Sequence, residues 1–147
     1  MADALFDFNE MARLALSRHW SAQSPRDQEE FVRLFTALLE RSYLSTIENY
    51  AGERITFLGE SIDGSYAQVR SRITTDRRVE ISIDYRLIDR GDRWEVYDVV
   101  LDNVSLVSNY RSQFNSIIRT SSFGELLTRL RNKQIEAHVI PRVGRGS

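Results

Sequence analysis

The spacing of hydrophobic and polar positions divides the chain into a helical part, a strand-like part and a second helical part. Up to residue 50 the apolar residues recur at helical spacing, and from 54 to 101 many of them alternate with polar residues. Helical spacing returns after residue 103, and all seven glycines fall from Gly52 onward, where turns between strands are expected. This order predicts an α+β fold, with helices before and after a four-stranded antiparallel meander and packed on one face of a curved sheet.

The first part contains signals for two helices. A short helix is expected to begin with Asn9 as its N-cap and to end near His19. The second has Ser24 as its N-cap and Pro25 at its first helical position, and it is expected to run to about Tyr50. Its apolar residues occupy two faces, so it should be covered on two sides. The pattern alone leaves open whether this helix lies in a packed core or lines a cavity.

The middle part predicts strands separated by short turns. A strand begins at residues 55–60 and turns at Gly64, and the clearest alternation of apolar and polar residues lies in 79–87. A second turn at Gly91 leads into 94–101, which has apolar residues on both faces. Alternation indicates a sheet with one dry and one wet face, whereas the segment 94–101 should be covered on both sides.

The last part predicts two further helices. The apolar stripe of 107–119 is expected to pack on the sheet, and Ser122 with Glu125 three residues later forms a capping box for the final helix. The residues after this helix have no convincing period. The chain is therefore expected to form a single domain over 1–133, followed by a weakly ordered tail over 134–147.

Composition and charge narrow the possible functions. Twenty basic and 21 acidic residues give a net charge of -1, with both signs interspersed, so nucleic acid is not expected as a partner. The sequence has no cysteine, which excludes disulfides and thiolate metal sites. The N-terminal segment 1–10 has three acidic residues and no basic apolar run, so we expect neither a signal peptide nor a membrane span there, and we do not expect a membrane-embedded protein.

The residues needed for catalysis are sparse. His19 and His138 are the only histidines, and neither has a second metal ligand at helical or hairpin spacing. A glycine-rich phosphate loop is missing, and no nucleophile has an evident activating base. Two carboxylates such as Asp84 and Asp98 could still meet in space. We expect a protein that is not an enzyme and that needs no cofactor or metal.

One stretch of sequence is more specific than these patterns. From Trp94 to Phe114 the chain reads WEVYDVVLDNVSLVSNYRSQF, which resembles the signature of the toluene-tolerance or MlaC family. The segments at 11–20, 24–38 and 84–87 agree with the same family, so the resemblance covers about residues 6–131. A chance match of this length is improbable.

The resemblance implies a function and a location. Members of that family are exported to the periplasm, where they carry a phospholipid between an outer-membrane lipoprotein complex and an inner-membrane MCE/ABC transporter. This chain begins where the family usually already has one or two helices, and it carries no export signal. The resemblance therefore implies a periplasmic carrier whose chain is either trimmed at its N-terminus or unusual.

The physics of a lipid cargo agrees with the apolar faces of the predicted helix and sheet. Two acyl chains of about sixteen carbons each, at roughly 0.8 kcal/mol per buried CH₂, represent more than about 20 kcal/mol of unfavourable contact with water. A carrier therefore needs a deep apolar cavity, which a two-sided helix beside a one-sided sheet would form in a cone-like fold. The resemblance to the family at Asn109, Tyr110 and Arg111 implies a role with the lipid headgroup, for which Arg111 is the main candidate; the alternative is that Arg111 holds its helix to the sheet by an ion pair. The candidate lining residues are Phe35, Leu38, Leu39, Tyr43, Ile47, Val69, Ile81, Ile83, Tyr85, Val99, Tyr110, Phe114 and Ile117.

Three other functions remain open at this stage. A sister branch of the family is linked to hopanoid lipids, so the cargo is either a phospholipid or a hopanoid-type lipid. Small isomerases and hydratases have a similar cone of helices and curved sheet, and such an enzyme would have a buried acid or histidine in its pocket. An adaptor that bridges other proteins would instead have a cavity filled by its own side chains.

Overall fold

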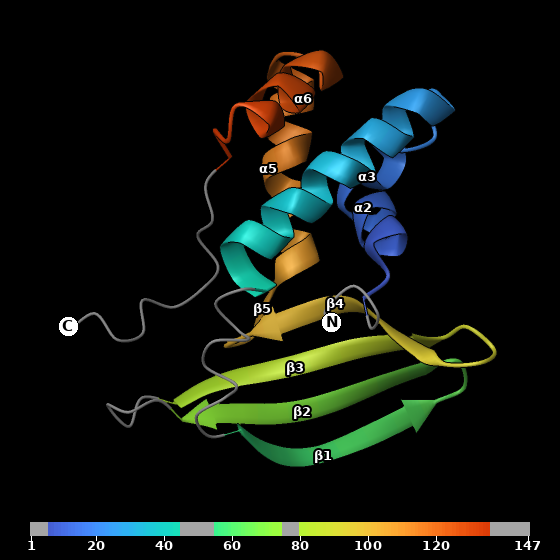
Figure 1. Cartoon of the computed structure of the whole chain (residues 1–147), viewed down its shortest axis with the longest axis vertical. Helices are drawn as coiled ribbons and strands as arrows, with labels where there is room; N and C mark the ends of the chain where they lie inside the picture. The colour runs from blue at the N-terminus through green and yellow to red at the C-terminus, as the bar shows by residue number, and fades with distance from the viewer. Residues whose placement is uncertain (1–5, 45–54, 75–79, 136–147) are drawn as a thin grey trace.

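The computed structural model describes residues 6–44, 55–74 and 80–135, which form a layer of helices and a curved sheet (Figure 1). The helices gather over one side of the sheet, above β4 and β5, and β1 lies at the far edge (Figure 1). This arrangement agrees with the predicted α+β class and places the helices before and after the strands in the chain.

The N-terminal helices begin at side-chain caps. Helix α2 (Phe8–Leu16) is capped by Asp7, whose carboxylate accepts a hydrogen bond from the Glu10 amide at 3.0 Å. The prediction of Asn9 as the cap was wrong. Because the side chain of Asp7 already accepts a hydrogen bond from an amide of the first turn, the helix begins at Phe8 and Asn9 lies within it. A short 3₁₀ turn, η1 (Ser17–His19), follows.

Helix α3 (Pro25–Leu39) has the predicted start. The Ser24 hydroxyl accepts a hydrogen bond from the Asp27 amide at 3.1 Å, and Pro25 occupies the first turn. The helix continues as a π-helical turn, η2 (Glu40–Leu44). The predicted extension to Tyr50 lies outside the described residues.

The sheet contains five antiparallel strands in consecutive order. The four predicted strands are confirmed, and the fifth corrects the prediction. It has only two residues, too few for a recognisable period, and it pairs with the end of β4. The strands are β1 (Ile55–Asp63), β2 (Tyr66–Thr74), β3 (Glu80–Asp89), β4 (Trp94–Leu101) and β5 (Val104–Ser105).

The C-terminal helices complete the upper layer. Helix α5 (Leu106–Thr120) contacts β4 and β5 and also packs against α2, so it rests only in part on the sheet as predicted. Helix α6 (Phe123–Arg131) begins where expected, because the Ser122 hydroxyl accepts a hydrogen bond from the Glu125 amide at 3.0 Å.

The core joins the two layers. It contains residues of α2, α3, α5 and α6 together with the strand residues that point toward them. Ile135, at the start of the predicted tail, is also buried in this core, and the tail from residue 136 lies outside the described part of the chain. None of the described helices combines the length and the apolar character that a membrane crossing requires.

Candidate functional site

One face of the sheet is apolar and points toward the helices. The pairing register places Ile73 beside Ile81, Ile83 beside Leu101 and Tyr85 beside Val99. Ile73, Ile81, Ile83, Val99 and Leu101 all belong to the buried core that includes the helices. We call this side of the sheet the inner face.

The rows of the inner face that begin on β4 are buried there and open toward β1, where the middle row ends at the exposed Glu60 opposite Val69. One row runs from Val96 (5% exposed) through half-buried Leu87 and Ala67 to Ile62, which is 61% exposed. A second row, two rows further along the strands, runs from Leu101 through Ile83 and Ser71 to Phe57. Leu101 and Ile83 are buried, whereas Phe57 is 68% exposed. This gradient leaves an apolar surface on β1–β3 beyond the cover of the described helices. We call it the apolar floor, which consists of Ile55, Phe57, Ile62, Ala67, Val69, Tyr85 and Leu87.

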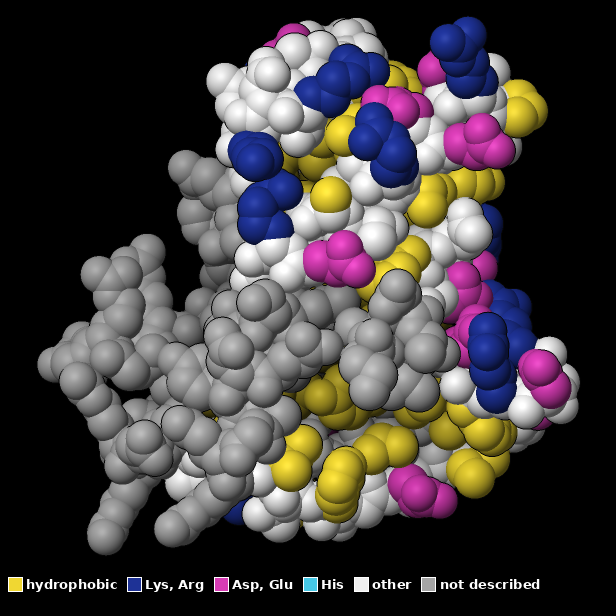
Figure 2. Space-filling model, viewed as in Figure 1, with side chains coloured by type: hydrophobic (Ala, Val, Ile, Leu, Met, Phe, Trp, Pro, Cys, Tyr) yellow, Lys and Arg dark blue, Asp and Glu magenta, His cyan; other side chains and the backbone are white. Residues whose placement is uncertain are grey.

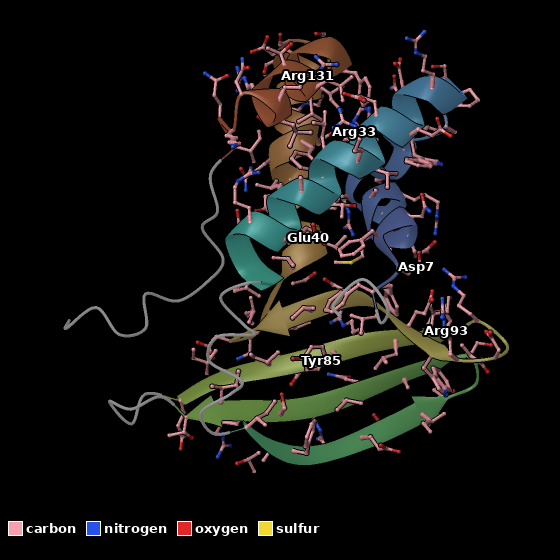
Figure 3. The ribbon with its side chains drawn as sticks, in the orientation of Figure 1. Asp7, Arg33, Glu40, Tyr85, Arg93 and Arg131 are labelled. Atoms are coloured by element: carbon pink, nitrogen blue, oxygen red, sulfur yellow. The ribbon has the colours of Figure 1, made fainter. Side chains whose placement is uncertain are left out.

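Hydrophobic side chains are visible over the lower strands in Figure 2, below the helical layer. Figure 3 shows Tyr85 on the sheet, below the helices. Burial in this apolar setting raises the pKa of Tyr85 above its ordinary value. The buried hydroxyl of Ser71 on the same face donates to the Ile83 carbonyl at 2.7 Å, so it presents no unpaired donor to the floor. The site is suited to apolar contact.

The helical residues predicted to line a cavity are mostly packed against one another. Phe35 of α3 contacts Tyr110 and Phe114 of α5, with ring centroids 5.5 Å apart in each pair, and Phe31 and Phe123 extend this aromatic cluster. The predicted lining residues of α3 and α5 that are fully buried are Phe35, Leu38, Leu39, Tyr110 and Phe114.

The predicted strand residues lie together on the inner face. Val69, Tyr85 and Val99 form one row across β2, β3 and β4, and Ile81 and Ile83 are buried nearer the core. The structure therefore brings together the sheet part of the predicted lining. Whether these residues contact a lipid stays a prediction.

Four further predicted residues have separate outcomes. Ile117 of α5 is half-buried and packs against the core. Tyr43 belongs to η2 by its backbone, but its side chain lies outside the described residues, as does the whole of Ile47. Arg111 is exposed on the side of α5 that faces α2, where its Nε donates to the Leu14 carbonyl at 3.2 Å. Its role with a headgroup stays a prediction.

The prediction missed five residues of the floor, which are Ile55, Phe57, Ile62, Ala67 and Leu87. A strict period of two from Phe57 would place Ile62 on the opposite face, but a β-bulge between Phe57 and Gly59 shifts the register of β1. Gly59 was the available signal, since an isolated glycine within a strand pattern often marks a bulge. Leu87 also carries a signal, because it is part of the alternating pattern of 79–87.

The buried acid and the described histidine both have structural partners. Asp98 accepts hydrogen bonds from the Val99 and Val107 amides at 2.8 and 3.0 Å and from the Ser105 hydroxyl. His19 Nε2 lies 2.8 Å from Asn115 Oδ1, which ties η1 to α5. Within 6–44, 55–74 and 80–135, no group of three or more acidic or histidine side chains is arranged to hold a metal ion.

A separate hollow lies between α3 and α6 and is charged. Its volume is about 710 Å³, and Figure 3 shows two of its lining residues, Arg33 on α3 and Arg131 on α6. Glu30 forms ion pairs with both arginines, and the hydrogen bond from Arg33 holds the pKa of Glu30 below its ordinary value. A hollow lined by ion pairs is unsuited to acyl chains. Its lining residues are Arg26, Asp27, Glu29, Glu30, Arg33 and Arg131.

Comparisons with known proteins agree with one another. The family model described as "MlaC protein" matches residues 1–132. The intermembrane phospholipid transport system binding protein MlaC of Haemophilus influenzae is 22% identical over 120 residues, which cover 78% of this chain and 56% of that protein. The chain therefore spans little more than half the length of that relative.

A solved structure has the same fold. The phospholipid-binding protein from Ralstonia solanacearum, determined in complex with a phospholipid, superposes with a TM-score of 0.79 at 24% sequence identity. The match covers 89% of this chain and 74% of that protein. The likeness shows that the helices and the curved sheet form an arrangement already known from experiment.

Proposed function

The chain belongs to the MlaC family, and from that premise we propose that it binds a phospholipid by its acyl chains and carries it between two membranes. The relatives support the proposal through what they do, since one belongs to an intermembrane phospholipid transport system and another was solved with a phospholipid.

The observation that carries the proposal is the apolar floor. Phe57 and Ile62 are 68% and 61% exposed, yet they lie in rows of the inner face that continue into the core. Covering such a side chain fully contributes about 1.5–3 kcal/mol, so the free protein gains stability from any apolar guest that lies on the floor. An acyl chain is a guest of the required chemistry.

We place the acyl chains between the floor and the helical layer. In this proposal Val69 and Tyr85 contact the chains directly, and Ile81, Ile83 and Val99 form the inner end of the cavity. The aromatic cluster of Phe35, Tyr110 and Phe114 then closes the cavity as its rigid wall. The cone-like cavity is thus part of the proposal, and its support is the gradient of exposure along each row.

The proposed route follows from the family. The carrier works in the periplasm, receives its lipid from an outer-membrane lipoprotein complex or delivers to it, and exchanges with an inner-membrane MCE/ABC transporter. Support for this step comes from the intermembrane transport system to which the Haemophilus relative belongs. Because binding acyl chains and releasing them breaks no covalent bond, the proposal requires no catalytic step.

The test is to identify what the purified protein binds. Native mass spectrometry and solvent extraction should reveal a phospholipid at about one molecule per chain, and the protein should take up labelled phospholipid from vesicles. If the extract contains a hopanoid and no phospholipid, the cargo is a hopanoid-type lipid. A protein that arrives empty and takes up no labelled lipid would contradict the proposal.

A further inference from the structure

Two buried amide groups on α5 have no hydrogen-bond acceptor among the described residues. They are the side-chain nitrogens Nδ2 of Asn109 and Nε2 of Gln113. Each residue is half-buried as a whole, but the nitrogen itself is fully buried. A buried donor without an acceptor is unfavourable, because its hydrogen bonds to water are lost and not replaced.

The two amides form a pair. Residues four apart on a helix lie one above the other on the same side, at a separation of about 6 Å along the axis. Arg111, two residues from each, lies on the other side of α5, where it bonds to Leu14 of α2. Since Arg111 is turned toward α2 and residues two apart on a helix point to nearly opposite sides, Asn109 and Gln113 lie on the side turned away from α2.

Apolar residues border the amide pair along the same side of the helix. Leu106, one turn before Asn109, is fully buried. Ile117, one turn after Gln113, is half-buried. Two donors between apolar neighbours suit a ligand whose oxygen acceptors adjoin hydrocarbon. The glycerol end of a phospholipid has this chemistry, with ester carbonyl and phosphate oxygens next to the acyl chains.

We propose that Asn109 and Gln113 donate hydrogen bonds to the ester or phosphate oxygens of the bound lipid and thereby fix how deeply it sits. The inference rests on the proposed function and adds a polar contact of the lipid to it. It also gives a basis for selectivity: a site with buried donors rejects a ligand that leaves them unpaired. A hopanoid hydrocarbon, which has no oxygen, should therefore bind more weakly than a diacyl phospholipid.

The test uses the near-isosteric variants Asn109→Leu and Gln113→Met, singly and combined. Ser112→Leu, at an exposed position of the same helix, is the matched control. The full chain is freed of lipid and titrated with a fluorescent diacyl phosphatidylglycerol, and its melting temperature is measured without lipid. We expect the double variant to bind at least about tenfold more weakly than the wild type, since two hydrogen bonds together contribute 1.4 kcal/mol or more. The control should bind as the wild type does.

The lipid-free measurement separates a ligand contact from a structural one. If the acceptors belong to the lipid, the lipid-free variants should melt at or above the temperature of the wild type, because no protein hydrogen bond is removed. A lower melting temperature in both single variants would show that the chain itself supplies the acceptors, and it would overturn the inference.

A diether phosphatidylglycerol distinguishes the two kinds of oxygen. It keeps the phosphate and lacks the ester carbonyls. If the wild type binds the diether lipid more weakly than the diacyl lipid and the double variant does not distinguish them, the ester carbonyls are the acceptors. If the double variant loses the same factor of affinity for both lipids, the phosphate is the acceptor. Both results support the inference.

Two results would count against the inference in different ways. A double variant that binds like the wild type, or a loss seen only in Arg111→Gln, would overturn it and leave the proposed function intact. A wild type that binds no phospholipid would overturn the proposed function and this inference with it.

Discussion

At the scale of single residues, buried polar groups fix where the elements meet. Asp98 of β4 is 4% exposed, and its carboxylate accepts hydrogen bonds from its neighbour Val99, from Val107 in the first turn of α5 and from the Ser105 hydroxyl. Arg86 lies 3.5 Å away and balances part of the charge. A carboxylate near a helix N-terminus is also favoured by the helix dipole. One side chain thus connects the last long strand to α5.

We expect Asp98→Ala to lower the free energy of unfolding by about 3 kcal/mol, because it leaves buried amides without an acceptor. Urea denaturation monitored by circular dichroism measures this loss. The control Asp92→Ala changes an exposed residue of the β3–β4 turn and should stay within about 0.5 kcal/mol of the wild type. Equal effects of the two substitutions would show that the hydrogen bonds of Asp98 contribute little.

At the scale of the elements, the register of the strands decides what the site is made of. β1 is the edge strand, and its bulge shifts the side chains beyond Phe57 so that Ile62 joins the inner face. Without the bulge, the second half of β1 would present the opposite set of side chains to the floor. The size of the apolar floor therefore depends on one irregular position.

Neighbouring residues of β1 offer a matched pair of substitutions. Phe57 points to the inner face, and Thr56 beside it points to the opposite, exposed face. We expect Phe57→Asp to weaken phospholipid binding by about tenfold or more, since a carboxylate against an acyl chain loses its hydration without a partner. Thr56→Asp should bind like the wild type.

Vesicle-exchange titrations measure both affinities, and thermal melting shows that both variants fold, since each residue is exposed in the free protein. Equal affinities for the two variants would place the acyl chains elsewhere than on the floor.

At the scale of the whole molecule, the helical layer is tied to the sheet at one end by charge. Figure 3 shows Asp7 at the foot of α2 and Arg93 at the β3–β4 turn on the same side of the molecule. Arg90 of this turn pairs with Asp7 and lies 3.8 Å from Glu10 and 3.9 Å from Glu95. The backbone adds a hydrogen bond of 2.9 Å from the Asp7 amide to the Val96 carbonyl.

We expect Arg90→Met to lower the free energy of unfolding by about 1 kcal/mol at low ionic strength, a modest value because the side chain is 38% exposed. In 1 M salt, where the Debye length is about 3 Å, most of the difference should disappear. Denaturation at the two salt concentrations measures the effect. Arg119→Met, at an exposed position without an ion pair to a described residue, is the control, and a salt-independent loss in Arg90→Met would contradict the electrostatic origin.

Much of the fold could be predicted from local signals. Ser24 with Pro25 and Ser122 with Glu125 mark the starts of α3 and α6, and the predicted limits of β4 are those observed. These features depend on residues close together in the chain, so their physics is visible in the sequence. The first helix cap was misassigned because Asp7 and Asn9 are chemically equivalent candidates.

The site was less predictable than the fold. An apolar residue has the same pattern whether it meets its own protein or a guest, so Phe35 and Phe114 were grouped with Val69 and Tyr85. In the structure the first pair is packed in an aromatic cluster and the second pair lies half-buried on the sheet. Only the packing distinguishes them.

The sequence by itself determined the order of the helices and the four long strands and the apolar face of the regular ones, because hydrogen-bond geometry ties a period of two or 3.6 to a strand or a helix. The tertiary structure alone decided which of those faces fill one another and which stay open. Packing depends on the shapes of side chains brought together from distant positions, and a bulge of one residue in β1 is enough to change which of them meet.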